Sequence, residues 1–225
     1  YLIKNLMIEN KYFIELGVGD FLESNCRFLM MNDNWTGFVI DESIEDIEKL
    51  KSQKWFWMYN LNAISKFITK ENINNILSDI NEKNIGIIHI DIDGNDYHIF
   101  KKIKLDVLNP SIIILEYNSL FGPDRAITIP YRSDFNRTKA HYSNLFFGAS
   151  LRAMEYISEK KGYSLIGTNR AGNNAYFIRN DLLNSKIKRV DIQSAYHYSK
   201  FREGRDPKGF FSLISGEDRF QLIKG

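Results

Sequence analysis

Three aspartates within a run of six residues are the most chemically suggestive feature of this sequence. Asp91, Asp93 and Asp96 lie in the segment DIDGND, and the apolar run from Gly86 leads directly into it. A short apolar run bounded by turn residues predicts a buried strand, and open α/β sheets bind ligands at the carboxyl ends of such strands. Carboxylates placed there could orient a bound hydroxyl and remove its proton, hold a metal ion, or attack phosphorus.

These chemistries compete with one another and with a purely structural role. D-x-D after an apolar strand is how many glycosyltransferases hold a metal and a sugar nucleotide. DIDGN is similar to the nucleophile loop of haloacid-dehalogenase-type phosphatases, but that loop is expected on the first strand of a domain and this one follows the fourth. A calcium loop is excluded because the glycine and the final Glu are misplaced. The structural alternative is that Asp93 and Asp96 only cap a helix from Tyr97 to Ile103.

A second candidate site lies near the start of the sequence. The segment KYFIELGVGD combines an apolar strand with Glu15, Gly17 and Gly19. Glycines at a strand end allow a sharp turn and the close approach of a ligand, which is typical of nucleotide-binding β-α units. A second apolar strand ends in Asp41 and Glu42, where an acidic residue accepts hydrogen bonds from ribose hydroxyls. This pattern predicts half of a site for an adenosine-type ligand; the alternative is a βαβ unit without a ligand.

Polar residues further along could contact a second substrate. Glu116, Tyr117 and Asn118 end another apolar strand and should lie at the same edge of the sheet. The segment 117–150 is long and rich in aromatic and turn residues, which predicts a lid or binding loop. It contains His141, which is either a general base or a solvated histidine. Guanidinium groups bind anionic acceptors bidentately, and four arginines could do so here: Arg125, Arg137, Arg202 and Arg205.

The composition bounds the class of protein. The chain has 225 residues, 44% of them hydrophobic and 26% charged, which indicates one ordinary globular domain. A net charge of +2 argues against bulk nucleic-acid binding. The single cysteine, Cys26, excludes an intrachain disulfide and favours a cytoplasmic location, and its apolar helical position predicts a core residue. No apolar run is long enough to span a bilayer. The sequence starts at Tyr1 close to a predicted strand, so we expect native residues upstream.

The elements that must position these residues alternate along the chain. We expect a strand before the glycine turn and strands over residues 36–41, 54–60, 86–91, 110–116, 163–168 and 175–179. Helices are expected over residues 21–32, 44–51, 72–83, 97–103 and 151–161. This alternation predicts an α/β fold, a Rossmann-like doubly wound and mostly parallel sheet that ends in an antiparallel hairpin. The chain reads as a single domain, 1–225, with residues 117–150 as an insertion and 185–225 as a C-terminal extension.

This order of elements resembles the class I S-adenosylmethionine-dependent methyltransferases, in which an antiparallel last strand lies beside the fifth. Several phrases resemble the FkbM-type enzymes of bacterial glycan and natural-product pathways: KENINNIL, IIHIDIDGNDYHIF, PSIIILEYN, FFGASL, GTNRAGNNAYFIRNDLL and FREGRDPKGF. The resemblance implies S-adenosyl-L-methionine as cofactor. It places Glu15, Gly17 and Gly19 at the methionine end of the cofactor. It also assigns further contacts: Asp41 and Glu42 at the ribose, Asn60 and Leu61 near the adenine, and Asp91 facing the methyl donor. Phe21 stands near the place of the usual third glycine.

The resulting hypothesis is an O-methyltransferase that acts on a sugar or sugar-linked, phosphorylated or acidic acceptor in bacterial surface-polysaccharide (capsule) biosynthesis. The candidates for its catalytic base are Asp91, Asp93, Glu116 and His141, and no metal ligand is assigned on this hypothesis. One alternative is a metal-dependent glycosyltransferase that uses Asp91 and Asp93, and another is a non-catalytic binding protein of methyltransferase fold. The expected partner is a small-molecule or glycan acceptor, and the chain could form a homodimer.

Overall fold

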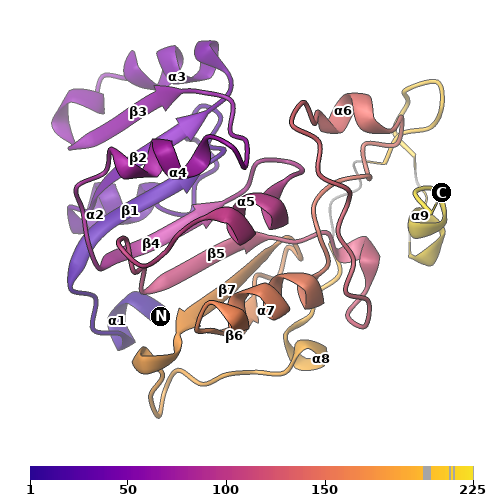
Figure 1. The fold of residues 1–225 in the computed structure, drawn as a ribbon. Helices are drawn as coiled ribbons and strands as arrows, with labels where there is room; N and C mark the ends of the chain where they lie inside the picture. Colours follow the sequence, from indigo (N-terminus) through magenta and orange to yellow (C-terminus); the bar gives the residue numbers. More distant parts are fainter. Residues whose placement is uncertain (200–203, 213, 215, 225) are drawn as a thin grey trace.

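The computed structural model describes residues 1–199, 204–212, 214 and 216–224. Seven strands of this described chain form one sheet in the order β3-β2-β1-β4-β5-β7-β6 (Figure 1). Their bounds are β1 Asn10–Leu16, β2 Thr36–Asp41, β3 Leu61–Ser65, β4 Ile85–Ile90, β5 Ile112–Glu116, β6 Tyr163–Thr168 and β7 Asn174–Arg179. Strands β1 to β5 pair in parallel, while β7 runs antiparallel to both β5 and β6. The predicted mostly parallel sheet is confirmed, and its antiparallel last strand lies beside the fifth, as the resemblance implied.

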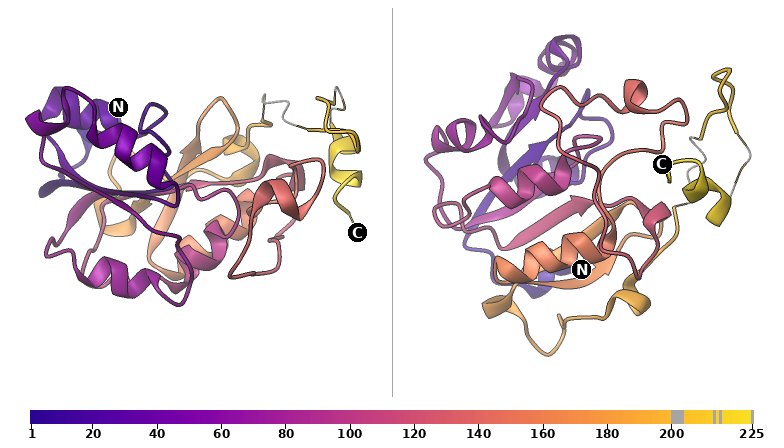
Figure 2. Two further views of the ribbon diagram at one scale, coloured as in Figure 1. Left: turned by 90° about the horizontal axis from the view of Figure 1, so that it is seen from above. Right: turned by 45° about the vertical axis from the view of Figure 1, so that its right-hand side comes forward.

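Helices cover both faces of the sheet, so the molecule has three layers (Figures 1 and 2). The α-helices are α1 Leu2–Asn5, α2 Arg27–Asp33, α3 Ile44–Lys51, α4 Ile73–Ser78, α5 Asp96–Lys102, α6 Arg137–Ala140, α7 Leu151–Lys160, α8 Ile192–Ala195 and α9 Glu217–Gln221. Short 3-10 turns are η1 Phe56–Met58, η2 Ser119–Phe121 and η3 Asn180–Leu182. One hydrophobic cluster joins the sheet to α4, α5 and α7, and another joins its opposite face to α2 and α3.

Local sequence explains where the best-defined elements begin and end. The β4 strand, IGIIHI, is buried at all six positions, as expected of a central parallel strand covered on both faces. Ser43 caps α3, because its side chain accepts a hydrogen bond from the amide of Asp46. Ser150 caps α7 in the same way through the amide of Ala153. Both caps hold the following helix against the sheet near the carboxyl ends of the strands.

The prediction of a third strand over residues 54–60 is wrong. Its centre forms η1, in which Trp57 is 82% exposed and Met58 is 60% exposed. The ring of Trp55 instead lies tilted beside Phe21 and edge-on to Tyr59. The third strand, β3, begins only at Leu61, so aromatic β-propensity predicted the strand too early in the sequence. Two predicted helices are also shorter than expected, since α2 starts at Arg27 and α4 ends at Ser78.

The segment 117–150 crosses the carboxyl-terminal edge of the sheet and contains η2 and α6. Its apolar side chains form a hydrophobic cluster together with two residues of the C-terminal region, Phe220 and Ile223. Asn95 Nδ2 donates a hydrogen bond to the carbonyl of Arg132 at 2.8 Å, and the Gly148 amide donates to the carbonyl of Gly94 at 3.0 Å. The segment is therefore held against the turn between β4 and α5.

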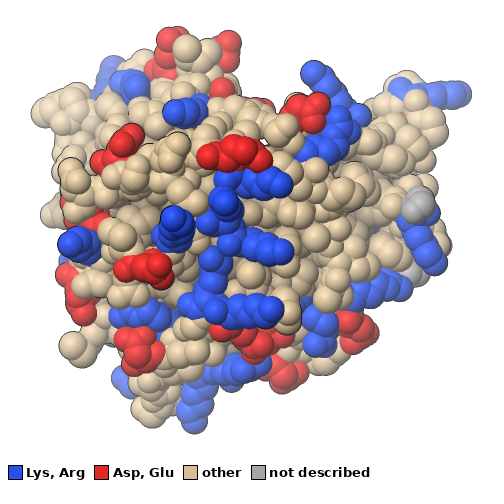
Figure 3. Space-filling view, in the orientation of Figure 1, with Lys and Arg blue, Asp and Glu red and all other residues tan. Residues whose placement is uncertain are grey.

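The surface carries charges of both signs. On the face shown in Figure 3, basic side chains run down the middle with acidic side chains on either side of them. No helix within the described ranges combines the length and apolar character needed to cross a bilayer.

Candidate active site

A cavity of about 740 Å³ opens at the carboxyl ends of β1 to β4. The turns that follow these four strands line one side of it, and the 117–150 segment closes the other. The lining includes residues 17–20 after β1, 41–43 after β2, 66–68 after β3, 91–93 after β4, and 135–138 from the crossing segment. This is the edge of an open α/β sheet at which ligands bind.

The two glycines after β1 have different surroundings. A Cβ on Gly17 would overlap the carbonyl oxygen of Asp91, and the φ angle of Gly17 is +80°. Gly17 therefore lets the ends of β1 and β4 pack together. Gly19 has a φ of +49°, and no atom lies within 4 Å of the place where its Cβ would be. The open space that a ligand could enter thus lies beside Gly19.

Asp41 shapes the glycine turn from the neighbouring strand. Its Oδ2 accepts hydrogen bonds from the amides of Val18 at 2.9 Å and Gly19 at 2.7 Å, and its Oδ1 accepts one from the amide of Ser43 at 2.9 Å. Glu42 is exposed and also lines the cavity. Both acidic residues that were expected to bind ribose lie at the cavity, and Asp41 holds the turn as well.

Glu15 lies beneath the cavity and does not line it, contrary to its expected place at the cofactor. It is 1% exposed, and its carboxylate accepts hydrogen bonds from Ser24 Oγ at 2.6 Å and from the amide of Asn25 at 3.0 Å. Its Oε1 lies 2.7 Å from Nδ1 of His89. Burial lowers the pKa of His89, but the hydrogen bond and charge of Glu15 outweigh burial and raise it. Glu15 is a buried anchor of the turn that follows β1.

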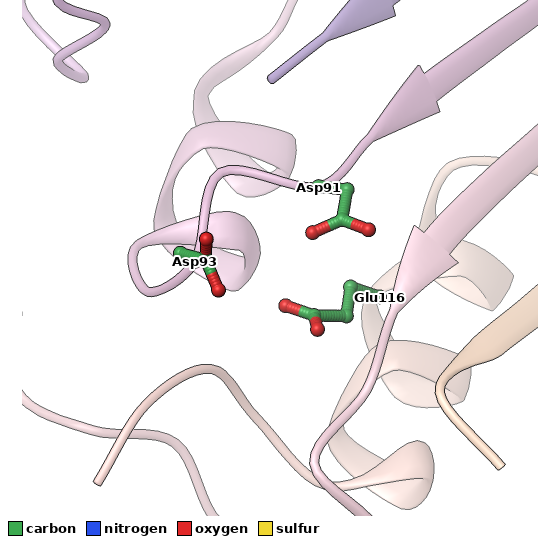
Figure 4. A group of neighbouring side chains, drawn as sticks. All are labelled: Asp91, Asp93 and Glu116. Carbon is green, nitrogen blue, oxygen red and sulfur yellow. The ribbon is translucent and has the colours of Figure 1, made fainter. Parts of the chain in front are cut away.

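Asp91, Asp93 and Glu116 converge on one another (Figure 4); Asp91 and Asp93 line the cavity, whereas Glu116 is buried and is not part of the lining. One carboxylate oxygen from each lies within 4.8 Å of the others. Asp91 follows β4 and Glu116 ends β5, and these strands are parallel neighbours with Ile90 opposite Leu115. The predicted juxtaposition of the two strand ends is therefore observed.

The electrostatics of this carboxylate cluster are unfavourable for three negative charges. Burial raises the pKa of Asp91 to about 6, and nearby His89 opposes that shift. Burial, with the charges of Asp91, Asp96 and Asp93, raises the pKa of Glu116 well above its usual range. Glu116 is only 7% exposed, and its Oε2 has no hydrogen-bond partner. The cluster therefore favours the uptake of positive charge.

Asp96 has a structural role beside the cluster. Its two oxygens accept hydrogen bonds at 2.9 Å from the amides of Ile92 and Gly94, so it closes the turn before α5. Burial and then the charge of Asp91 raise the pKa of Asp96 to about 7. The expectation that Asp93 and Asp96 cap α5 is wrong in detail, because Asn95 occupies the cap position.

Among the predicted arginines, Arg137 lines the cavity. Its Nη1 donates to Asp93 Oδ1 at 2.5 Å, its Nε donates to the carbonyl of Asn144 at 2.9 Å, and its guanidinium lies 3.8 Å from the ring centroid of Phe147. Arg125 instead lies over Phe220, and Arg205 lies over Phe211, both outside the cavity lining. Arg202 falls outside the described residues.

Three further candidates lie away from the cavity, so their predicted catalytic or substrate contacts are not supported by this geometry. His141 Nδ1 lies 2.7 Å from Oγ of Ser143 within the crossing segment. Tyr117 is buried and donates to the carbonyl of His197 at 2.7 Å. Asn118 Nδ2 donates to two carbonyls of the segment, which makes it an internal brace. Short-range polar bonding within a loop is not visible from the sequence.

Asn60 and Leu61 lie at the amino end of β3, on the opposite edge from the cavity, so their predicted place near the adenine is wrong. The register of β3 causes this difference, since Leu61 pairs with Gly37 and Ser65 with Asp41. The cavity is lined instead by three residues that follow β3: Lys66, Phe67 and Ile68. The available signal in the sequence was polar Asn62 between apolar Leu61 and Ala63, an alternation that matches the burial of this strand.

The comparisons with known proteins agree with this topology. A family model described as the methyltransferase FkbM domain matches residues 9–165, more than half of the sequence. The chain belongs to this family. It is accordingly a methyltransferase that depends on S-adenosylmethionine, and the predicted fold class, enzyme class and cofactor are confirmed. A search of curated proteins finds no match.

Three solved structures similar to this FkbM-family chain are distant from it in sequence. An O-methyltransferase from Bacillus cereus in complex with SAH is 13% identical with a TM-score of 0.48, over 75% of this chain and 72% of that one. M. capricolum TrmK in complex with S-adenosyl-homocysteine is 10% identical with a TM-score of 0.47, over 87% and 71%. The bifunctional kinase-methyltransferase WbdD is 12% identical with a TM-score of 0.45, over 75% and 34%.

The cavity of this FkbM-family chain fits its cofactor in size and chemistry. Ligand pockets commonly have volumes of about 300–1,000 Å³. The open space beside Gly19 leaves room at the glycine turn, Glu42 offers an exposed carboxylate for ribose hydroxyls, and Phe67 offers a ring face for a base. These residues would hold S-adenosylmethionine with the carboxylate cluster close to its reactive end.

Proposed function

We propose that this methyltransferase transfers a methyl group to an oxygen of a sugar or sugar-linked acceptor in bacterial surface-polysaccharide biosynthesis. The observation that carries the proposal is the convergence of the Asp91, Asp93 and Glu116 carboxylates, of which Asp91 and Asp93 line the cavity together with Arg137. Carboxylates accept hydrogen bonds from hydroxyl groups, and a guanidinium binds acidic or phosphorylated groups. A polyhydroxylated and anionic acceptor matches both kinds of contact.

In this mechanism the enzyme chiefly positions its two substrates. When bound, S-adenosylmethionine supplies a methyl group already activated for displacement. The carboxylate of Asp91, or that of Glu116 in its ionised form, would accept the hydrogen bond of the acceptor hydroxyl and take its proton as the oxygen attacks. Asp93, held by Arg137, would orient a second hydroxyl. Phe135 and the rest of the crossing segment would limit access of water from the open side.

The cofactor half of the proposal is tested by calorimetry with S-adenosylhomocysteine. Glu42→Gln removes a charged acceptor for the ribose hydroxyls and is expected to raise the dissociation constant about tenfold, as for one lost hydrogen bond to a charged group. Glu48→Gln, an exposed position on α3 outside the cavity lining, serves as the control and should bind as the wild type does. Absence of binding by the folded wild type would leave the non-catalytic binding protein as the better hypothesis.

The acceptor half is tested by methyl transfer to a panel of neutral, acidic and phosphorylated sugars, with the products followed by mass spectrometry. We expect transfer to hydroxyl oxygens and a preference for anionic members. Arg137→Ala should raise the KM of anionic acceptors by a larger factor than the KM of neutral ones, which would be affected only through the release of Asp93. Arg132→Ala is the matched control, because Arg132 is exposed and pairs with Asp134 outside the cavity. Exclusive transfer to nitrogen or to non-glycan acceptors would overturn this proposal. A cytoplasmic location and a homodimer remain predictions.

A further inference from the structure

The carboxylate cluster has more acceptor atoms than the described residues satisfy. Asp91, Asp93 and Glu116 present three carboxylate oxygens within 4.8 Å of one another (Figure 4). Arg137 is the cation that pairs with one of them, through Oδ1 of Asp93. One guanidinium cannot balance three carboxylates, and close carboxylates repel one another strongly where water is scarce.

Two buried oxygens at this place have no hydrogen-bond partner among the described residues. Oε2 of Glu116 is one, and Figure 4 shows that the Glu116 carboxylate points toward Asp91 and Asp93. Oδ1 of Asn95 is the other; Asn95 is 4% exposed and lines the same cavity, while its Nδ2 is engaged with the carbonyl of Arg132. Buried acceptors are rarely left unsatisfied in native proteins, so the unpartnered Oε2 of Glu116 points to a positively charged ligand at the cluster, and Asn95 Oδ1 adds a free acceptor elsewhere in the same cavity.

We propose that Asp91, Asp93 and Glu116 bind a hard divalent cation of the Mg²⁺ or Mn²⁺ type. All the available ligand atoms are oxygens, and carboxylate oxygens with open positions for water are the ligands that such cations prefer. The three residues come from the ends of two neighbouring strands and from one turn, and the exposed side of Asp93 leaves an approach from the cavity.

Cation binding also accounts for the closeness of the three carboxylates. Their oxygens lie within 4.8 Å of one another, and negative charges at such distances repel strongly where water is scarce. A divalent cation between them would offset that repulsion. Its use in catalysis rests on the proposed function: the open positions would hold oxygens of the acceptor beside the methyl donor.

The test is calorimetric titration of the metal-free protein with MnCl₂, without cofactor or acceptor. We expect one site, with Glu116→Gln and Asp93→Asn each raising the dissociation constant at least about tenfold, because each removes one charged ligand. Asp93 is exposed, so its variant should fold even if the Glu116 variant does not. Glu23→Gln is the matched control, since Glu23 lines the cavity outside the cluster and should leave the affinity unchanged.

The proposal is overturned if the folded wild type binds no Mn²⁺, or if all three variants lose affinity equally. Titration with S-adenosylhomocysteine separates this inference from the proposed function. Mn²⁺ binding without S-adenosylhomocysteine binding would retain the metal site and reject the methyltransferase mechanism. The reverse result would retain the mechanism and reject the metal site.

Discussion

At the scale of single residues, the two glycines after β1 show that one motif can serve two needs. Gly17 is required because a side chain there would occupy the space of the Asp91 carbonyl, whereas Gly19 faces open space in the cavity. Both have positive φ angles, and an L-residue in the left-handed region costs roughly 1–2 kcal/mol. The steric overlap adds to that cost only at Gly17.

Alanine at these two positions should therefore separate backbone strain from packing. We expect Gly17→Ala to lower the free energy of unfolding by about 3 kcal/mol or more, since overpacking adds about 1–3 kcal/mol to the strain. Gly19→Ala should cost about 1 kcal/mol. Urea unfolding followed by circular dichroism measures both values. Equal losses at the two positions would contradict this explanation of the turn.

Glu15 provides a second prediction at this scale, because the structure gives it a buried network in place of a cofactor contact. Glu15→Gln keeps the size of the side chain but weakens its bonds to Ser24, Asn25 and His89. The free energy of unfolding should fall by about 2–3 kcal/mol, as when one member of a buried charged network is removed. Calorimetry of the folded variant should show an unchanged affinity for S-adenosylhomocysteine. A large loss of affinity with wild-type stability would restore the role expected from the family resemblance.

At the scale of elements, the sequence was most informative where strands are apolar throughout. The runs that became β4 and β5 predicted both strands, and parallel pairing then required Asp91 and Glu116 to be neighbours. The sequence failed at KWFWMYN, where aromatic residues favour a strand, but Trp55 packs beside Phe21 and residues 56–58 form a 3-10 turn. Because β3 starts later than predicted, the cavity is lined by residues after Ser65 and not by Asn60 and Leu61. Contacts within the 117–150 segment are set by tertiary packing, which no local pattern reveals.

Phe135 is the contact through which that segment packs on the catalytic turn. It is 7% exposed, and its ring fills the space beside Gly94 that a side chain on the glycine would need. Phe135→Ala should cost about 3 kcal/mol, the lower end for a buried Phe truncation, and should speed amide hydrogen exchange across 117–150 more than in β1 to β5. Phe211→Ala is the control, because Phe211 is 69% exposed. If amide exchange in residues 117–150 were no faster in Phe135→Ala than in Phe211→Ala, contacts other than Phe135 would hold this segment on the sheet.

At the scale of the whole molecule, Cys26 offers an internal reporter of unfolding. It is the single cysteine of 225 residues, it is fully buried, and it packs in the hydrophobic cluster beneath α2 and α3. Burial, reinforced by the charge of Glu15, raises the pKa of its thiol well above the usual range. The thiolate is the reactive form, so the folded protein should not react with a disulfide reagent at mildly alkaline pH. Reaction then requires opening of the core.

The rate of that reaction should report how strongly the cofactor site is coupled to global stability. A ligand at about one hundred times its dissociation constant stabilises the folded state by about 2.7 kcal/mol, so S-adenosylhomocysteine should slow labelling of Cys26 about a hundredfold. Labelling is followed by the absorbance of the thiol released from the reagent, and the control is the same protein without S-adenosylhomocysteine. Because the turn after β1 connects the cavity to the strand beside Cys26, a global opening must break both. Labelling that is slow but unaffected by the ligand would show instead that α2 opens locally while the cavity stays formed.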